Sequence, residues 1–293
     1  MSLDALLQVL IGGVLLGGLY ALVAFGLSLI YGVVRILNFA HGTLLAVGGV
    51  IASMLYASFK WHPVVLMLVL VPAFCVFGYF FYVWLLQPLA RRNHFESTVG
   101  TVLVTVGALL MLSDLTAKLA GATQKNIPLR FEAIEIGEIV ISTTQIWILA
   151  GIAALTCAMH LFLKRTWFGR AIRAVTQDPV GAQICGVHSN SLKAATFAVG
   201  CGVVAIAAVL YTMSFPVDPY MGFGLTVKAF TIIILGGIGN LAGALVAGLF
   251  LGIAEGLTGF FWKPEWSPAL SVFLLLVILV VFPNGFSFAR RRR

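Results

Sequence analysis

The sequence predicts an all-α protein, a polytopic transmembrane helical bundle of eight or nine crossings with some of its helices broken. Of its 293 residues, 61% are hydrophobic and only 10% are charged, whereas a soluble domain carries roughly a quarter charged residues. The apolar residues gather in runs of about 20, the length that crosses a bilayer as a helix. The net charge of +8 lies in short segments between those runs. Such a distribution sets orientation in a membrane, so no nucleic-acid partner is expected.

The apolar runs give the expected crossings in order. Seven of them fit one crossing each, at residues 5–31, 39–58, 63–86, 99–119, 143–163, 194–214 and 268–282. The run 223–261 is too long for one crossing, and an even number of crossings is needed between the basic loop ending at Lys193 and the C-terminal arginines. We therefore expect it to cross twice, with a turn at 236–240 and a short or unwound first crossing. This gives nine crossings, or eight if one run only re-enters the membrane.

Basic residues in short loops predict the orientation, because they are retained on the cytoplasmic side. They place three segments in the cytoplasm and the N-terminus outside, in the periplasm. Segment 121–142 balances its bases against acids and is expected to be periplasmic. The cytoplasmic markers are Arg91 and Arg92; Lys164, Arg165, Arg170 and Arg173; and Arg290 to Arg293, while Lys125, Arg130, Glu132, Glu135 and Glu138 mark the outer segment.

The longest basic loop, 164–193, contains signals for two separate helical pieces. Asp178 is placed as an N-cap, Pro179 as the first helical residue and Gly186 as the stop of a short second helix. This helix is predicted to present Val180, Ile184 and small residues such as Ala182. A short helix with an apolar face in a charged loop favours insertion into a partner's groove. Spacing alone leaves a plain surface helix as the alternative.

Small residues repeat every four positions in the run 241–261, at Gly248, Gly252 and Gly256. This spacing allows the backbones of two helices to approach closely, either within the chain or against a second membrane subunit. Glu255 lies beside Gly256, where it is either a residue of the transport pathway or an interfacial end residue, because an acid at the bilayer centre is costly. Asp114 poses the same alternatives.

Two asparagines open Gly- and Ala-rich helices. Asn38 is predicted to cap the helix that follows it. Asn240 opens the stretch 240–254, which is weakly similar to 38–52, so an inverted repeat is one interpretation of the pair. Exposed helix N-termini attract carboxylates, which makes Asn38 and His41 candidate substrate contacts, together with Asn240 as a further pathway candidate. The alternative is a capped turn with His41 at the cytoplasmic interface.

Three stretches resemble the LivH-type permease subunits of branched-chain amino acid ABC importers. They extend in order over nearly the whole chain, and the departures are slight, such as Val187 where an isoleucine is common. The stretches are Gly18 to Leu22 running on to Asn38 to Gly42, then Phe168 to Val175 with Asp178, Ala182 and Gly186-Val187, and finally Gly236 to Ala244.

The resemblance implies a permease of the ABC-importer type, a single domain over 1–293 in the bacterial inner membrane. It implies half of a translocation pathway for branched-chain amino acids or related small solutes, such as urea, amides or aromatic acids. The implied partners are a LivM-type permease, two cytoplasmic ATPases of the LivG and LivF type, and a periplasmic solute-binding protein. The 164–193 loop would contact the ATPase through Arg170, Arg173, Asp178, Pro179, Ala182, Ile184 and Gly186.

The outer segment 121–142, with alternating Ile134, Ile136, Ile139 and Ile141, is then expected to form a hairpin. It would either receive the binding protein or act as a simple periplasmic lid.

No enzyme or cofactor is expected in this chain. It lacks the phosphate-loop pattern GxxxxGK[ST], so ATP and Mg²⁺ would be bound by partner subunits. HExxH, GxGD and GxSxG are absent, and no catalytic or metal site is predicted. An ion-coupled secondary transporter is the alternative function, but it usually needs intramembrane ionisable groups, and Asp114 and Glu255 are the only acids in the expected spans.

Overall fold

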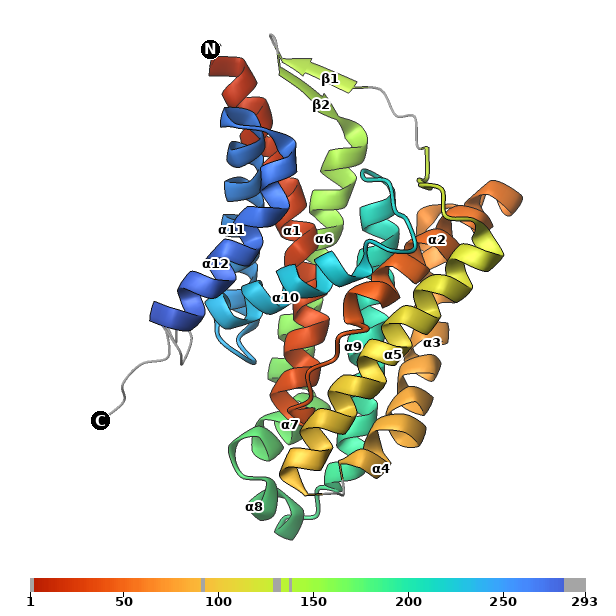
Figure 1. Ribbon diagram of the computed structural model, residues 1–293, viewed down its shortest axis with the longest axis vertical. Coiled ribbons are helices and arrows are strands. Elements are labelled where there is room, and N and C mark those ends of the chain that lie inside the picture. Colours follow the sequence, from red (N-terminus) through yellow and green to blue (C-terminus); the bar gives the residue numbers. More distant parts are fainter. Residues whose placement is uncertain (1–2, 91–92, 129–132, 137–138, 282–293) are drawn as a thin grey trace.

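The computed structural model describes residues 3–90, 93–128, 133–136 and 139–281. In this part of the chain the helices form an elongated bundle, with a small β-hairpin at one end and two short helices, α7 and α8, at the other (Figure 1). Seven helices are long and apolar enough to cross a membrane, and two shorter apolar helices cover Gly222–Gly236 and Pro264–Val280. These nine segments correspond to the nine expected crossings, whose number stays a prediction. Arg91, Arg92 and the arginines at 290–293 lie outside the described residues.

The elements follow one another in chain order. The helices are α1 (Leu3–Val34), α2 (His41–Phe59), α3 (Pro63–Phe81) with a π-helical continuation (Tyr82–Leu86), α4 (Gln87–Leu89), α5 (His94–Ala120), α6 (Thr143–Arg165), α7 (Trp167–Gln177), α8 (Pro179–Ile184), α9 (Ser189–Thr212), α10 (Gly222–Gly236), α11 (Leu241–Phe261), a 3₁₀ turn (Pro264–Trp266) and α12 (Ser267–Val281). The strands are β1 (Ala133–Ile136) and β2 (Ile139–Ser142).

α1 packs closely against α11 through glycines on both helices. A Cβ added to Gly252 would overlap the Cα of Gly17 and lie 2.5 Å from the carbonyl oxygen of Gly13. A Cβ on Gly248 would lie 2.8 Å from the carbonyl oxygen of Gly17, and one on Gly256 would lie 3.4 Å from that of Val9. The predicted small-residue face therefore packs within this chain.

α2 begins inside the bundle and not at its end. The Nε2 of the fully buried His41 lies 3.1 Å from the carbonyl oxygen of Val23. Val23 precedes the end of α1 by 11 residues, or about 16 Å of helix. The alternative of a capped turn with His41 at the cytoplasmic interface does not fit this buried position. The predicted cap is wrong, because Ala40 precedes the first residue of α2 and Asn38 Oδ1 instead accepts a hydrogen bond from the Ala40 amide at 3.1 Å.

The first turn of α10 meets the first turn of α2. The Gly42 amide donates to Thr226 Oγ1 at 2.9 Å, and the same hydroxyl donates to the carbonyl oxygen of Phe39 at 3.0 Å. Because a Cβ on Gly222 would overlap Thr43, only glycine fits there. The short first crossing that the sequence predicts for 223–261 is α10, and the predicted turn follows it at 237–240.

Segment 121–142 contains the predicted hairpin. β1 and β2 are antiparallel, with Ile134 opposite Ile141 and Ile136 opposite Ile139. Before the hairpin, Lys125 and Val217 exchange two backbone hydrogen bonds of 2.8 Å, which join this segment to the connection between α9 and α10. Arg130, Glu132 and Glu138 lie outside the described residues.

Candidate functional site

The arginines of α7 hold this helix against the end of α6. Arg170 Nη1 donates to the carbonyl oxygen of Arg165 at 3.2 Å, and Arg173 Nη1 donates to that of Leu163. The last carbonyls of a helix lack partners within the helix, and basic side chains commonly satisfy them. Arg170 and Arg173 therefore position the loop by capping α6, and their side chains stay exposed.

Gly169 makes the same junction possible. A Cβ at this position would overlap the carbonyl group of Leu163. The Gly169 amide also donates to Thr166 Oγ1 at 3.1 Å, which caps the start of α7. The sharp turn from α6 into α7 therefore requires glycine at position 169, because any larger residue would overlap the backbone of α6.

α8 has the caps that the sequence predicts. Asp178 Oδ1 accepts a hydrogen bond from the Val180 amide at 3.0 Å, and Pro179 is the first helical residue. Gly186 ends the helix with φ +86°. Its amide donates to Gln183 O at 3.0 Å and the Val187 amide donates to Ala182 O at 2.9 Å, the pair of bonds that defines a Schellman motif. Both ends of this six-residue helix are thus fixed by local hydrogen bonds.

α8 lies at the end of the bundle opposite the hairpin (Figure 1), and two of its large apolar side chains are exposed. Val180 is 67% exposed and Ile184 is 82% exposed. The prediction that Ala182 is presented with them is wrong, because Ala182 is only 5% exposed. It lies two residues from each of them, on the opposite side of the helix, and belongs to the buried core that α7 and α9 also form.

A buried ion pair joins four helices in the other half of the molecule. Lys228 Nζ on α10 lies 2.8 Å from Glu255 Oε2 on α11. Tyr20 of α1 donates its hydroxyl to the same oxygen at 3.0 Å, and Ser271 of α12 donates to Oε1. Glu255 is 3% exposed, so its side chain does not extend from the end of α11 into solvent. Polar groups at such depth in a membrane protein are expensive and usually functional.

Sequence reasoning missed Lys228 and its contacts with Tyr20 and Ser271, although one signal was available. In the apolar run 223–261, Lys228 and Glu255 are the only charged residues, and they have opposite signs. A charged pair of this kind in one apolar run predicts mutual neutralisation, because each charge alone would be costly in the membrane.

In the described part of the chain, the other candidate site residues form no hydrogen bond with the Lys228–Glu255 ion pair. Asn38 and His41 are fully buried, and Asn38 Nδ2 and His41 Nδ1 have no hydrogen-bond partner within the described ranges. Asn240 caps α11 by accepting from the Gly243 amide at 3.1 Å. Together with Lys164 and Arg173, Asn240 lines a cavity of about 580 Å³ near the α6–α7 junction. Asp114 is exposed on α5 and accepts from the Tyr220 hydroxyl at 3.2 Å.

Known proteins resemble the chain over nearly its full length. A family model described as "Branched-chain amino acid transport system / permease component" matches residues 9–281. The high-affinity branched-chain amino acid transport system permease proteins LivH of Salmonella typhimurium and of Escherichia coli K12 are each 32% identical, covering 95% of this chain and 94% of the relative. BraD of Pseudomonas aeruginosa is 31% identical, with the same coverage. A chain of the solved structure "PsaBC from Streptococcus pneumoniae in complex with Fab" aligns with a TM-score of 0.47 and 11% identity, covering 96% of this chain and 91% of that chain. The family model and the LivH and BraD relatives decide the assignment: the chain belongs to the permease-component family of branched-chain amino acid transport systems, and it is a membrane transport subunit and not an enzyme.

Proposed function

We propose that this permease imports branched-chain amino acids as one half of a pathway that it forms with a LivM-type permease. The relatives that span the same length are named for this transport. Two ATPases of the LivG and LivF type would supply the energy by binding and hydrolysing ATP with Mg²⁺, and a periplasmic binding protein would deliver the amino acid. The single observation that carries the coupling proposal is the capped α8 helix with its two exposed apolar side chains.

The proposed orientation has α7 and α8 in the cytoplasm and the N-terminus with the hairpin in the periplasm of a bacterial inner membrane. Lys164, Arg165, Arg170 and Arg173 are exposed around the α6–α7 junction, and such basic clusters are retained on the cytoplasmic side. The hairpin lies at the opposite end of the bundle (Figure 1). In this orientation the hairpin either receives the binding protein or covers the outer mouth.

Docking of α8 is proposed to seat Val180 and Ile184 in an apolar groove of an ATPase subunit. The two residues are four positions apart, so they share one face of the helix. Rigid caps at both ends let the helix transmit a movement of the ATPase without unwinding. Short helices with apolar anchors are a common way to fill a partner's groove.

The docking proposal predicts that Ile184→Asp weakens binding of the ATPase. An apolar anchor at the centre of an interface contributes on the order of 2 kcal/mol or more, which is about 30-fold in affinity. Fold stability should not change, because the side chain is 82% exposed. The measurement is the amount of ATPase that co-purifies in mild detergent. Gln183→Asp, at an exposed neighbouring position of α8, is the matched control. Wild-type recovery of ATPase with Ile184→Asp would contradict the docking proposal.

A second prediction concerns the cap at Asp178. Asp178→Ala should remove a helix cap worth about 1 kcal/mol and lower the ATP hydrolysis that accompanies transport, while the complex still assembles. Asp178→Asn should restore coupling, because asparagine caps as well as aspartate. The measurement is ATP hydrolysis stimulated by loaded binding protein in reconstituted vesicles. Equal stimulation in wild type and Asp178→Ala would exclude this role for the cap.

A further inference from the structure

The ammonium group of Lys228 has one N–H donor without an acceptor among the described residues. A lysine ammonium carries three N–H donors and no acceptor. Lys228 donates to the Tyr20 hydroxyl at 2.6 Å and to Glu255 Oε2 at 2.8 Å, and it also lies 4.5 Å from the centre of the Tyr20 ring. In the described part of the chain no other hydrogen bond of this group is seen, so its third N–H is available to an acceptor that the described residues do not supply.

The two partners of the ion pair differ in what else they contact. Both oxygens of Glu255 are occupied, Oε2 by Tyr20 and Lys228 and Oε1 by Ser271. The Glu255 side chain is 3% exposed, whereas that of Lys228 is 14% exposed. A molecule that reaches the pair would therefore meet the ammonium and not the carboxylate.

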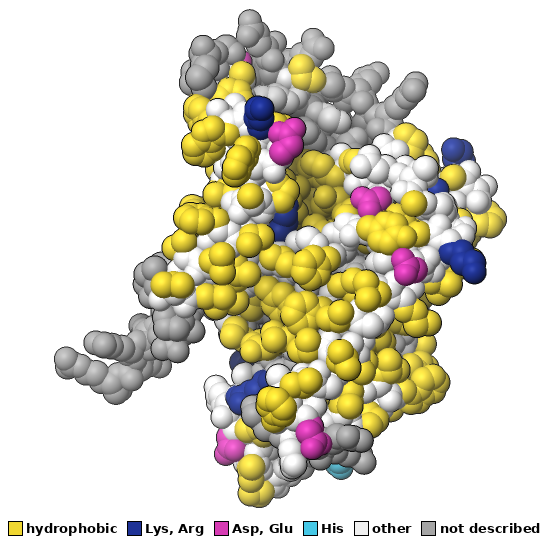
Figure 2. Space-filling view, in the orientation of Figure 1, with side chains coloured by type: hydrophobic (Ala, Val, Ile, Leu, Met, Phe, Trp, Pro, Cys, Tyr) yellow, Lys and Arg dark blue, Asp and Glu magenta, His cyan; other side chains and the backbone are white. Residues whose placement is uncertain are grey.

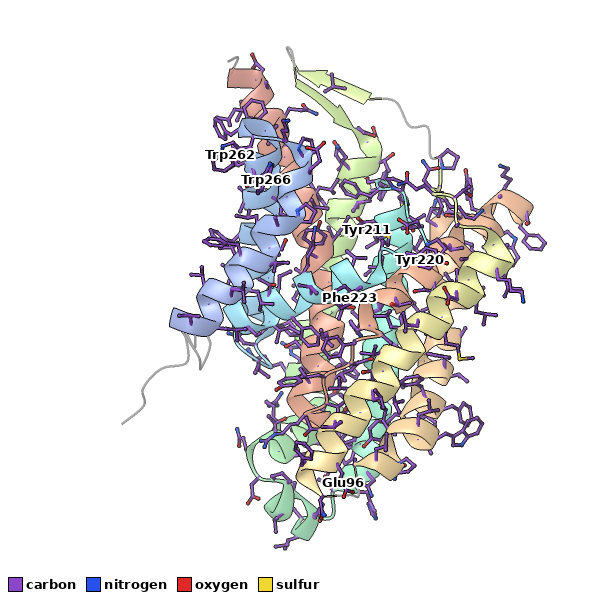
Figure 3. All side chains as sticks on the ribbon, viewed as in Figure 1. Glu96, Tyr211, Tyr220, Phe223, Trp262 and Trp266 are labelled. Carbon is purple, nitrogen blue, oxygen red and sulfur yellow. The ribbon has the colours of Figure 1, made fainter. Side chains whose placement is uncertain are left out.

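The ion pair lies on α10 and α11, which border a hollow in one face of the molecule. Figure 2 shows this face recessed between the α11–α12 pair and the helices α2 and α5, with a basic side chain inside the recess. Tyr211, Tyr220 and Phe223 lie on the same face across the middle of the bundle (Figure 3). Tyr220 and Phe223 are each 55% exposed. Aromatic side chains on the same face as one ammonium group suit a small molecule that has both an apolar side chain and a carboxylate.

We propose that Lys228 binds the α-carboxylate of the amino acid as it passes through the membrane, an inference that rests on the proposed function as an amino acid importer. The bond would be a charge-assisted hydrogen bond, about twice as strong as a neutral one. Glu255 and Tyr20 are positioning residues, because they hold the ammonium in place and do not face the recess. Because Glu255 already neutralises Lys228, the carboxylate is held weakly enough to leave, as conduction requires.

The test uses the whole complex, with its partner permease, ATPases and leucine-loaded binding protein, reconstituted in vesicles of phosphatidylethanolamine and phosphatidylglycerol. The readout is the amount of radiolabelled leucine imported for each ATP hydrolysed. The variant Lys228→Met with Glu255→Met removes both charges and leaves neither unpaired. We expect it to assemble and to hydrolyse ATP in response to loaded binding protein, but to import about tenfold less leucine for each ATP, the loss of one charge-assisted hydrogen bond. Lys118→Met, on exposed α5 surface, is the control and should keep the wild-type ratio.

A charge swap separates substrate contact from a purely structural role. Lys228→Glu with Glu255→Lys restores an ion pair but places a carboxylate where the ammonium was. We expect the swap to recover assembly and not leucine import, because like charges repel. A wild-type leucine-to-ATP ratio in the double methionine variant, or import restored by the swap, would overturn the inference and leave the pair structural. If wild-type complex hydrolyses ATP but imports no leucine, the proposed function fails, and the inference fails with it.

Discussion

Replacing Gly252 with alanine is expected to separate α1 from α11 and to destabilise the protein more than a methyl group added to any other glycine at the contact between these two helices. The new Cβ would overlap backbone atoms of Gly17 and crowd the carbonyl oxygen of Gly13. Backbone atoms cannot rotate away as side chains do, so the two helices must move apart. Forcing extra atoms into a packed contact costs about 1–3 kcal/mol or more. The measurement is the melting temperature and the yield of folded complex in detergent.

The sign of this effect distinguishes close packing from helix propensity. Alanine is intrinsically better in a helix than glycine by about 1 kcal/mol, so the same substitution in open space should be neutral or stabilising. Gly12, on α1, has no atom within 4 Å of the Cβ it would acquire, and Gly12→Ala is therefore the control. If Gly252→Ala melts as high as Gly12→Ala, the α1–α11 contact is looser than the structure shows.

Glu255→Met alone is expected to cause the second large loss of stability, about 3–5 kcal/mol, because it leaves the Lys228 ammonium, whose side chain is only 14% exposed, without its counter-charge. Tyr20 and Ser271 would lose their acceptor as well. We expect little folded protein to be recovered from membranes, as measured by gel filtration in mild detergent and by the melting temperature of what remains.

The stability cost should nearly disappear when Lys228→Met is added. Replacing both partners of a buried ion pair by apolar residues of similar size is often neutral or stabilising. A double-mutant cycle of the two substitutions therefore measures how strongly the residues interact. Equal stability of Glu255→Met and wild type would show that the pair is not formed in the folded protein. The double variant is also the one whose transport tests the role of Lys228, so stability and transport can be separated in the same protein.

The features that the sequence predicted correctly depend on contacts between neighbouring residues. The caps of α8 at Asp178 and Gly186 are hydrogen bonds between residues two to five positions apart. Asn240 caps α11 in the same way, through Gly243. Such short-range hydrogen bonds follow from residue type and spacing alone, which is why the ends of these helices could be placed without a structure.

The features that sequence reasoning missed depend on distant residues. Asn38 has the residue type of an N-cap, yet α2 begins at His41 because Gly42 bonds to Thr226, 184 residues away. Lys228 contacts Glu255 across 27 residues of sequence, and Tyr20 contacts Glu255 across 235 residues. Hydropathy averaged over a run hides a single charge, and no local pattern indicates which charges will meet. The face that α8 turns toward α7 and α9 was misjudged at Ala182 for the same reason.

The glycine contact between α1 and α11 also constrains how the chain is made. Tyr20 and its acceptor Glu255 are 235 residues apart, so at translation rates of about 5–20 residues per second the first helix waits roughly 10 to 50 seconds for its partner. During that time α1 lies in the membrane with its glycine face open and its tyrosine hydroxyl without this acceptor. The contacts between α1 and α11 can therefore form only after nearly all of the chain has been inserted. The packing of the first helix thus depends on correct insertion of the last third of the polypeptide.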